Sequence, residues 1–567
     1  MPSPALQQLL DLQRSMYDRA LTEARECCGA DSDSILKYQQ EFEASLPNDF
    51  STIPARKLME AMDRSRVILF GDFHSHKQTQ RAFLRALRMY QNRPDHAPIA
   101  VCLEMFKSKD QQHVNAWMSG HTTDQHLHES IDYESTWGFP WNNYRPILDY
   151  CKQENIPVIG INTSKGGKDP LAKRDAHCAG IIQRILKKNT SLKVLCMIGE
   201  FHLADRHLPS ALTSLPKNVL ETPPLRIFAN LDKYYFAIRP DKLDGRDEYL
   251  ELNRSTYCVI NSPPWIKWHS QSLWEEMRRI GSVKYLENSL ASDDSAQDID
   301  GWEDDDESLY DDETIDIDYH LRHFQSKILE FLNIKAPGSL LERFCVVHGE
   351  LETELSHMPA AARTAFLLRA SADGFAVDYS GRLVYIPEIS VNNMSAAAGQ
   401  MLFGSISQAS ETYTDTELLF TAQCLKYTFG YIANKILNPR KPLQGIKQVE
   451  AYILQSRGKR LIGLMRQRRQ VAQATLNIHA WISENWQVKA PQSAELRRIP
   501  APWTRLDQAT SHELCRSLAQ LIAEPICRGL LRGKVDTVDL QKWLQRDCKN
   551  IKAAKETLAA MITMSSA

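Results

Sequence analysis

Two stretches of the sequence end an apolar run in a glycine and place a histidine three residues later. They read "RVILFGDFHSH", which begins at Arg66, and "KVLCMIGEFHLADRH", which begins at Lys193. The polar residues that they contribute are Asp72, His74, Glu200, His202 and His207. Imidazole nitrogens and carboxylate oxygens bind zinc, manganese and iron, and they also serve in general acid–base catalysis. One strand-end histidine is usually a hydrogen-bonded surface residue, but the repeated GxxH pattern favours a real site.

Two further apolar runs end in polar residues. Glu104 lies inside "IAVCLEMF", and "PVIGIN" ends in Asn162. A carboxylate inside an apolar strand is costly to bury unless it is paired or bound to a metal. Ligands of open parallel sheets bind where the carboxyl ends of the strands meet, so we expect one site at this edge. Its predicted catalytic residues are His74, Glu104, Glu200 and His202, and a metal ion would be held by the same four residues together with Asp72.

Aromatic residues give further candidates. Tyr144 and Tyr133 could supply phenolate ligands to ferric haem, although an ordinary half-buried aromatic is the more common role. Asn162 and His207 are the other residues predicted to contact a cofactor. The tryptophan-rich stretch "NSPPWIKWHSQSLW" is expected to pack against the sheet domain rather than to form a ligand platform.

The elements that must position these residues read as an α/β fold. The apolar runs are rich in β-branched residues and lack alternation, which is typical of parallel strands buried on both faces. Between them lie "QRAFLRALRMYQ", "YRPILDYCKQEN" and "RDAHCAGIIQRILKK", whose apolar residues recur at helical spacing. We therefore expect a parallel or mixed sheet flanked by helices, with "RIFANL" and "KYYFAI" as additional strands.

Charge divides the chain. The segment between residues 290 and 319 contains "DIDGWEDDDESLYDDETIDID", and such an acidic block predicts a disordered linker. The expected domains are N-terminal helices packing on the α/β domain (1–64), the α/β domain (65–289), the linker (290–319) and a mainly helical domain of unknown function (320–567). Within the last domain, "FAVDYSGRLVYIP" predicts a β-hairpin that turns at Ser380 and Gly381.

Composition indicates a folded protein of the cytoplasm. The apolar share is 43% and the net charge is −2. No apolar run approaches the roughly 20 residues that span a bilayer, and neither a signal peptide nor a lipoprotein signal is seen. The 12 cysteines include no CxxC pair, which favours reduced thiols. The basic stretch "LQSRGKRLIGLMRQRRQ" lacks interleaved aromatic residues, so nucleic acid is an unlikely partner. The oligomeric state stays open.

The motifs "GDFH", "CLEMF", "DQQ", "WNNYRPILDYC", "IGIN" and "GEFHLADRHLP", in this order, resemble the ChaN-like haem-uptake family. That family is placed with the Tiki and TraB proteins and the erythromycin esterases. The resemblance covers about residues 65–239 and implies an α/β fold with haem or iron binding in the ChaN-like branch. In the Tiki and esterase branches it implies hydrolysis, which is metal-dependent in the former. Asp72 stands where glutamate is commoner in the family.

Three hypotheses follow. The first is a domain that binds haem, iron or another divalent metal (zinc or manganese) through His74, His202, Glu104 and Glu200. The second is a hydrolase in which His74 or Glu200 is the general base and Glu104 a metal ligand or acid. The third is a degenerate scaffold whose acidic linker and basic helix engage partners. Haem or another small molecule is the expected ligand in the first case.

Overall fold

The computed structural model describes most of the chain, and the described residues are 3–28, 33–163, 170–238, 247–291, 316–335, 344–348, 351, 355–356, 358–409, 413–457, 463–486 and 497–566. These residues belong to two compact units. The α/β unit comprises Met16–Ile238 and Gly245–Ile315, and the helical unit comprises Met1–Ser15, Arg239–Asp244 and Asp316–Ala567. Most of the acidic segment that predicts a linker lies outside the described residues.

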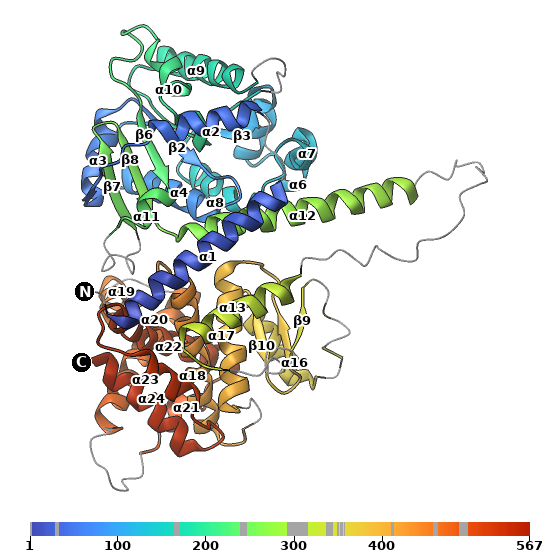
Figure 1. The fold of residues 1–567 in the computed structure, drawn as a ribbon, viewed down its shortest axis with the longest axis vertical. Helices are drawn as coiled ribbons and strands as arrows, with labels where there is room; N and C mark the ends of the chain where they lie inside the picture. The colour runs from blue at the N-terminus through green and yellow to red at the C-terminus, as the bar shows by residue number, and fades with distance from the viewer. Residues whose placement is uncertain are drawn as a thin grey trace, which may run out of the picture. The chain divides into compact units, whose positions relative to one another are not determined.

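An eight-stranded mixed sheet forms the centre of the α/β unit (Figure 1). Its order is β1-β7-β8-β6-β2-β5-β3-β4, and β7 runs antiparallel to both of its neighbours while the other pairs are parallel. The strands are β1 (Ser51–Ile53), β2 (Val67–Asp72), β3 (Ile99–Lys107), β4 (Val158–Asn162), β5 (Lys193–Gly199), β6 (Leu225–Ala229), β7 (Glu248–Asn253) and β8 (Thr256–Ile260). The predicted mixed sheet flanked by helices is confirmed.

The central strands are buried on both faces, as their uninterrupted apolar runs predict. Every residue of β2 is buried, and Phe70 meets Phe83 of α4 (Lys77–Gln91) edge-on, with 5.4 Å between ring centroids. The adjacent β2 and β5 are in register, so that Asp72 lies opposite Gly199. This pairing brings the ends of the two GxxH stretches together.

One predicted strand is wrong. "RIFANL" forms β6, but "KYYFAI" follows it as part of the short helix α11 (Asp232–Tyr235). Asn230 takes a left-handed conformation with φ of 55°, which turns the chain out of the sheet directly after β6. Tyr234 and Tyr235 then both become buried from one helical turn. The place beside β6 is taken by β8, a strand that the sequence analysis did not identify.

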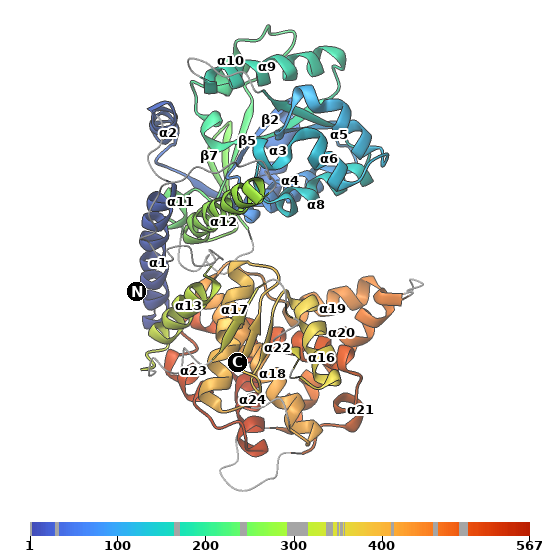
Figure 2. The same cartoon turned by 90° about the vertical axis from the view of Figure 1, so that its right-hand side faces the viewer.

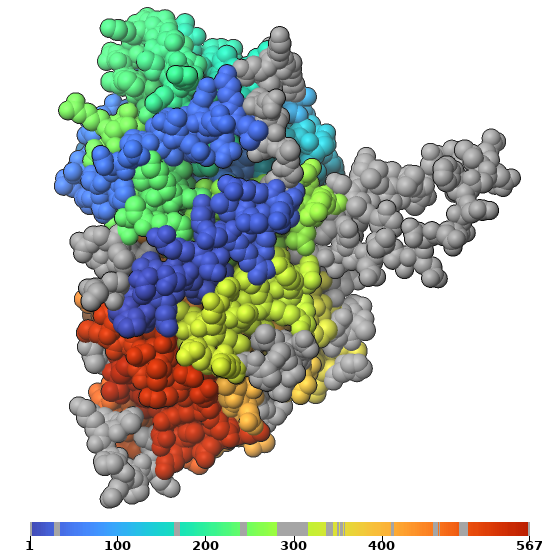
Figure 3. All heavy atoms as spheres, viewed as in Figure 1, coloured from blue at the N-terminus to red at the C-terminus, as the bar shows by residue number. Residues whose placement is uncertain are grey.

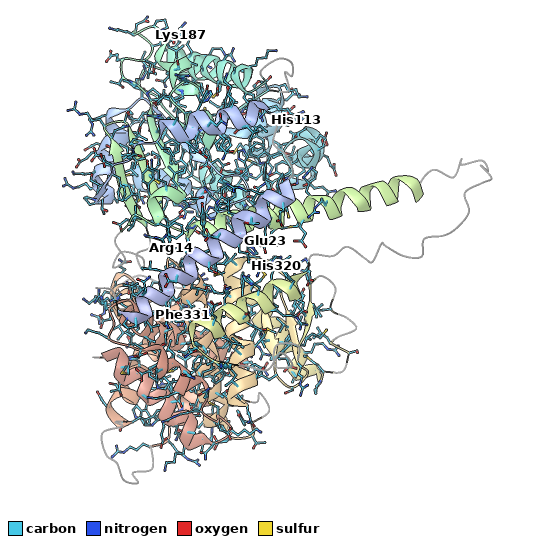
Figure 4. The ribbon with its side chains drawn as sticks, in the orientation of Figure 1. Arg14, Glu23, His113, Lys187, His320 and Phe331 are labelled. Atoms are coloured by element: carbon cyan, nitrogen blue, oxygen red, sulfur yellow. The ribbon has the colours of Figure 1, made fainter. Side chains whose placement is uncertain are left out.

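Helices flank the sheet at the predicted stretches. Figure 2 shows α9 and α10 lying side by side, as in Figure 1, and α4 and α8 also pack together. The helices of this unit after α1 are α2 (Asp33–Ser45), α3 (Ala55–Arg64), α4 (Lys77–Gln91), α5 (Gln111–Met118), α6 (Asp124–Ile131), α7 (Tyr133–Thr136), α8 (Trp141–Gln153), α9 (Pro170–Lys188), α10 (Leu208–Thr213), α11 and α12 (Pro264–Ala291), with 3-10 turns η1 (Ser108–Asp110) and η2 (Glu200–Leu203). Figure 4 labels His113 on α5 and the exposed Lys187 near the end of α9.

The helical unit is built around α18. This helix packs against α17 and α22, and α17 comes so close that a Cβ on Gly399 would lie 2.4 Å from the Cβ of Ala433. The unit's helices are α13 (Ile317–Phe331), α16 (Ala360–Asp373), α17 (Val391–Ser407), α18 (Thr416–Leu437), α19 (Ile446–Gln455), α20 (Gly463–Asn485), α21 (Ala501–Thr504), α22 (Gln508–Leu531), α23 (Thr537–Leu544) and α24 (Ile551–Ser566), and α1 (Pro4–Cys28) begins in it.

The predicted hairpin is confirmed within a larger sheet. Strands β10 (Ala376–Asp378) and β11 (Leu383–Tyr385) are antiparallel, and β9 (Cys345–Val347) adds a third strand parallel to β11. Among the described residues, no helix has the length and apolar content needed to cross a membrane.

Candidate functional site

Three adjacent strands deliver the predicted polar residues to one edge of the sheet. β5 lies between β2 and β3, so the segments after β2 and β5 both approach the end of β3. His74 follows β2 by two residues, Glu104 lies in β3, and Glu200 and His202 form the turn η2 directly after β5. Parallel strand direction places all of these carboxyl ends together.

Glu104 lies between the two GxxH histidines. Its Oε2 is 3.9 Å from His74 Nε2, and its Oε1 is 3.8 Å from His202 Nε2. The backbone N–H of Gly199 donates a 2.7 Å hydrogen bond to Oε2. Burial raises the pKa of Glu104, but the two imidazoles, this hydrogen bond and Arg174 outweigh it, so the net pKa is lowered. Glu104 is therefore a carboxylate that stays ionised in a buried position.

A second carboxylate orients each imidazole. His74 Nδ1 lies 2.9 Å from Asp72 Oδ2, and His202 Nδ1 lies 2.6 Å from Asp175 Oδ1. Each ring therefore directs Nε2 toward Glu104 while its other nitrogen is held from behind. Burial lowers the pKa of His74, but Asp72 above all, with Glu104 and Glu200, raises it above the usual value. A carboxylate behind an imidazole is the arrangement that fixes histidine ligands and general bases.

The supporting carboxylates have partners of their own. Asp72 accepts hydrogen bonds from the Tyr144 hydroxyl at 2.7 Å and from Gln80 Nε2 at 2.6 Å. Burial and the negative charge of Asp72 raise the pKa of Tyr144 well above its usual value. The structure thus places Tyr144 behind His74, where its hydroxyl is a hydrogen-bond donor.

His207 lies behind His202 and is covered by α2, which is one of the segments drawn in blue on the surface in Figure 3. The ring of Tyr38 stacks on His207 with 3.6 Å between centroids, and its hydroxyl donates to Asp175 at 3.1 Å. His207 Nε2 is 3.0 Å from Glu41 Oε2. Tyr38 and Glu41 of α2 thus hold His207 in a buried position behind His202.

Glu200 points away from the two imidazoles, toward the buried Lys267 of α12. Its Oε1 is 3.8 Å from Lys267 Nζ, which lies 2.9 Å from Asp232 Oδ1. Its Oε2 is buried and has no hydrogen-bond partner among the described residues. Burial, with the charges of Asp232 and Asp72, raises the pKa of Glu200 despite the opposing effect of Lys267. Glu200 therefore keeps its proton to a higher pH than an exposed glutamate would.

His74 is the accessible member of the cluster. Its side chain is 24% exposed, compared with 6% for both His202 and Glu104. The centroid of its ring lies 4.6 Å from that of Trp137 and 4.8 Å from that of Phe139. Phe139 in turn stacks on Trp274, with 4.2 Å between their ring centroids. All three aromatic rings are partly exposed, so the imidazole opens onto an aromatic surface.

Asn162, Asp72 and Glu200 were also predicted to bind a cofactor or a metal, but their side chains contact other partners. Asn162 ends β4, the last strand of the sheet, where its Oδ1 accepts a hydrogen bond from the Thr163 N–H. Within the ranges that the structure describes, no three His, Cys, Asp or Glu side chains are grouped as a metal site. Asp72 and Glu200, two of the five residues predicted to hold a metal, are directed toward other partners.

The glycines of the two motifs serve close packing. Neither Gly71 nor Gly199 has a positive φ, so neither position needs glycine for its backbone conformation. A Cβ on Gly71 would lie 3.2 Å from the Cβ of Glu200, and one on Gly199 would lie 3.4 Å from His74 Nε2. Gly199 thus leaves open the space that the two imidazoles and Glu104 face.

Sequence reasoning missed four supporting residues, namely Gln80, Arg174, Asp175 and Lys267. Arg174 and Asp175 lie in the first turns of α9, the helix that follows β4. A helix that follows a parallel strand begins at the carboxyl edge of the sheet, so this charged pair could have been predicted to lie near the site. Lys267 lies among tryptophans in α12, and no spacing connects it with Glu200 or Asp232.

Comparison with known families agrees with the resemblance. Residues 58–176 match the family described as "Haem-binding uptake, Tiki superfamily, ChaN". This ChaN match includes His74, Glu104 and Tyr144 and ends at the start of α9, before Glu200 and His202. The solved structure titled "Cofacial heme binding to ChaN of Campylobacter jejuni" matches with 14% identity and a TM-score of 0.25, over 37% of this chain and 92% of that chain. No curated protein sequence matches the chain.

Proposed function

We propose that the α/β unit binds haem at the edge of β2, β5 and β3, with His74 as the axial ligand of the iron. The observation that carries this proposal is the setting of His74. Its Nδ1 is held by Asp72 at 2.9 Å, its Nε2 points away from that carboxylate, and its side chain is 24% exposed. The match of the surrounding residues to a haem-binding family supports it.

The residues around His74 fit a haem group. Histidine is a common axial ligand, and a carboxylate on its other nitrogen raises its basicity. Trp137 and Phe139 offer partly exposed aromatic rings to an apolar macrocycle. Arg174, whose side chain is 40% exposed, lies 3.9 Å from Glu104 and could pair with the acidic groups of the porphyrin. Bound haem would supply an iron centre for redox or ligand-exchange chemistry.

Tyrosine is the less suitable ligand at this edge. Tyr144 and Tyr133 are both buried, and their hydroxyls donate hydrogen bonds to Asp72 and to the Phe139 carbonyl. Burial raises the pKa of each phenol, and a phenolate ligand must lose that proton. We therefore assign the axial position to His74 and assign Tyr144 to holding Asp72.

The experiment is a haemin titration of the full chain followed by absorption at the Soret band. We expect saturation at one haem per chain, and a loss of this saturation in His74→Ala. His121→Ala is the matched control, because His121 is an exposed histidine of the same unit. An equal response of His74→Ala and His121→Ala would contradict the proposal.

A second candidate function is hydrolysis at the buried part of the site, around His202 and Glu104. The observation that favours it is His202, whose Nδ1 is held by Asp175 at 2.6 Å while its Nε2 lies 3.8 Å from Glu104. A base that is oriented by a carboxylate can activate water. In this reading the ionised Glu104 positions the water. Turnover of an ester substrate that is lost in His202→Ala and retained in His121→Ala would support it.

A further inference from the structure

The helical unit contains a cavity of about 1020 Å³ that plays no part in the site described above. Helices α16, α18 and α22 and the turn between β10 and β11 line it. The cavity is open to solvent on one side, and its volume is at the upper end of those of small-molecule sites, roughly 300–1,000 Å³.

Apolar side chains make up most of the wall. α16 contributes Ala365 and Phe366, α18 contributes Leu419 and Phe420, and β11 contributes Leu383. On α16 the lining residues Ala362 and Ala365 lie three apart, and on α18 Thr416 lies three and four residues before Leu419 and Phe420, so each helix turns one face to the cavity. Leucine and phenylalanine side chains supply the apolar part of these faces.

One apolar side chain that lines the cavity is exposed to solvent. It belongs to Leu368 of α16, which is 37% exposed. Exposed apolar surface at the rim of a concave site is a recurring mark of ligand-binding grooves. The cavity can therefore admit an apolar ligand from solvent.

Positive charge predominates among the charged side chains in the wall. Arg369 and Arg505 line the cavity, and Arg369 lies over the ring of Phe366 at 5.9 Å. The carboxylate in the wall, Asp378, is buried and accepts a 2.6 Å hydrogen bond from the Gly381 N–H. Guanidinium groups pair with carboxylates in a bidentate geometry, so the charged part of the ligand should be an acid.

The floor of the cavity is held by a buried polar network. His512 lines the cavity, its Nδ1 lies 2.8 Å from the Tyr427 hydroxyl, and its Nε2 lies 3.3 Å from Asp373 Oδ2. Arg516 donates to the other oxygen of Asp373 at 2.8 Å. Such a network fixes the spacing of α16, α18 and α22 and keeps the cavity open.

We propose that this cavity binds an amphipathic carboxylic acid, a molecule with an apolar chain and one acidic head. The apolar tail of the ligand lies against Phe366, Leu419 and Phe420, and its acidic head pairs with Arg369 or Arg505. This site is independent of haem binding, because it uses no residue of the α/β unit.

Isothermal titration of the full chain with decanoic acid tests the proposal, with decan-1-ol as the matched ligand without the acid. We expect saturable binding of one decanoate per chain, and an affinity at least about tenfold lower for decanol. Ala365→Trp fills the cavity and should abolish binding of both ligands. The absence of saturable decanoate binding to the natural chain would overturn the proposal.

Variants that remove charge distinguish the contribution of the ligand's acidic head to binding from that of its apolar tail. Arg369→Gln combined with Arg505→Gln should weaken decanoate about tenfold and leave decanol unchanged, whereas Arg468→Gln, an exposed arginine of α20, should change neither. Arg505→Gln alone removes an exposed side chain and serves if the double variant fails to fold. Equal decanoate affinity in the natural chain, in Arg505→Gln and in Ala365→Trp would refute the site. His74→Ala should bind decanoate normally, which keeps this test separate from that of haem.

Discussion

His74 and His202 face the same carboxylate, with their Nε2 atoms 3.9 and 3.8 Å from the two oxygens of Glu104. The two rings differ in access, because His74 opens to a partly exposed aromatic surface and His202 is buried. This difference divides the site into an outer half, to which we assign haem, and an inner half that holds the polar network in place.

The first prediction concerns pH. An imidazole must be neutral to bind iron, and Asp72 with Glu104 and Glu200 raises the pKa of His74 above 6.5. Haem affinity should therefore increase as pH rises through a midpoint above 6.5. In Asp72→Asn the midpoint should move to lower pH, and affinity at high pH should fall by roughly 10–100-fold because the ring loses its orienting carboxylate. Haemin titrations at a series of pH values measure both effects.

The same group gives a stability dependence with a defined sign. A raised folded-state pKa means that the folded chain binds the proton more tightly than the unfolded chain. The stabilisation is fully present below the unfolded value and is lost as pH rises through the folded pKa. The free energy of unfolding of His74→Gln should thus differ most from that of the natural chain at low pH. A difference that grows toward high pH would contradict the assigned ion pair.

The second prediction compares the two motif glycines. In Gly199→Ala the new methyl group meets His74 Nε2 at 3.4 Å and Glu104 Oε2 at 3.5 Å, which are ordinary contact distances. Stability should change by less than about 1 kcal/mol, but the methyl group stands beside Nε2, so haem affinity should fall. In Gly71→Ala the methyl group is forced to 3.2 Å from the Cβ of Glu200, which should cost about 1–3 kcal/mol. Thermal unfolding and haemin titration of both variants separate these effects.

The third prediction concerns the buried cation behind Glu200. Lys267 is 3% exposed and pairs with Asp232 and Glu200. Lys267→Met leaves the buried Glu200 and the half-buried Asp232 without their cation and should lower the free energy of unfolding by about 3–5 kcal/mol. Lys233→Met is the control, because Lys233 is an exposed lysine of α11 and should change stability little. Equal unfolding midpoints in urea for the two variants would show that the cluster carries no such energy.

Much of this arrangement follows from the sequence, because strand order is constrained by physical rules. The apolar runs before Gly71 and Gly199 predict parallel strands, and these strands, β2 and β5, pair in parallel so that their ends are neighbours. β1 and β9 are only three residues long and carry little pattern of their own, whereas β7 and β8 are at least as long as the predicted β4 and β6 and were overlooked. Asp175 and Lys267 were missed for another reason, since their partners are distant in the chain and only tertiary packing brings them together.

The measurement that tests the central claim most directly is ligand replacement at the iron. His74→Gly removes the imidazole and leaves Asp72 and the aromatic flank in place. The absorption spectrum of its haem complex should differ from that of the natural chain, and added imidazole should restore it by occupying the vacated position. An identical spectrum in His74→Gly without imidazole would show that another residue binds the iron and would contradict the assignment of His74.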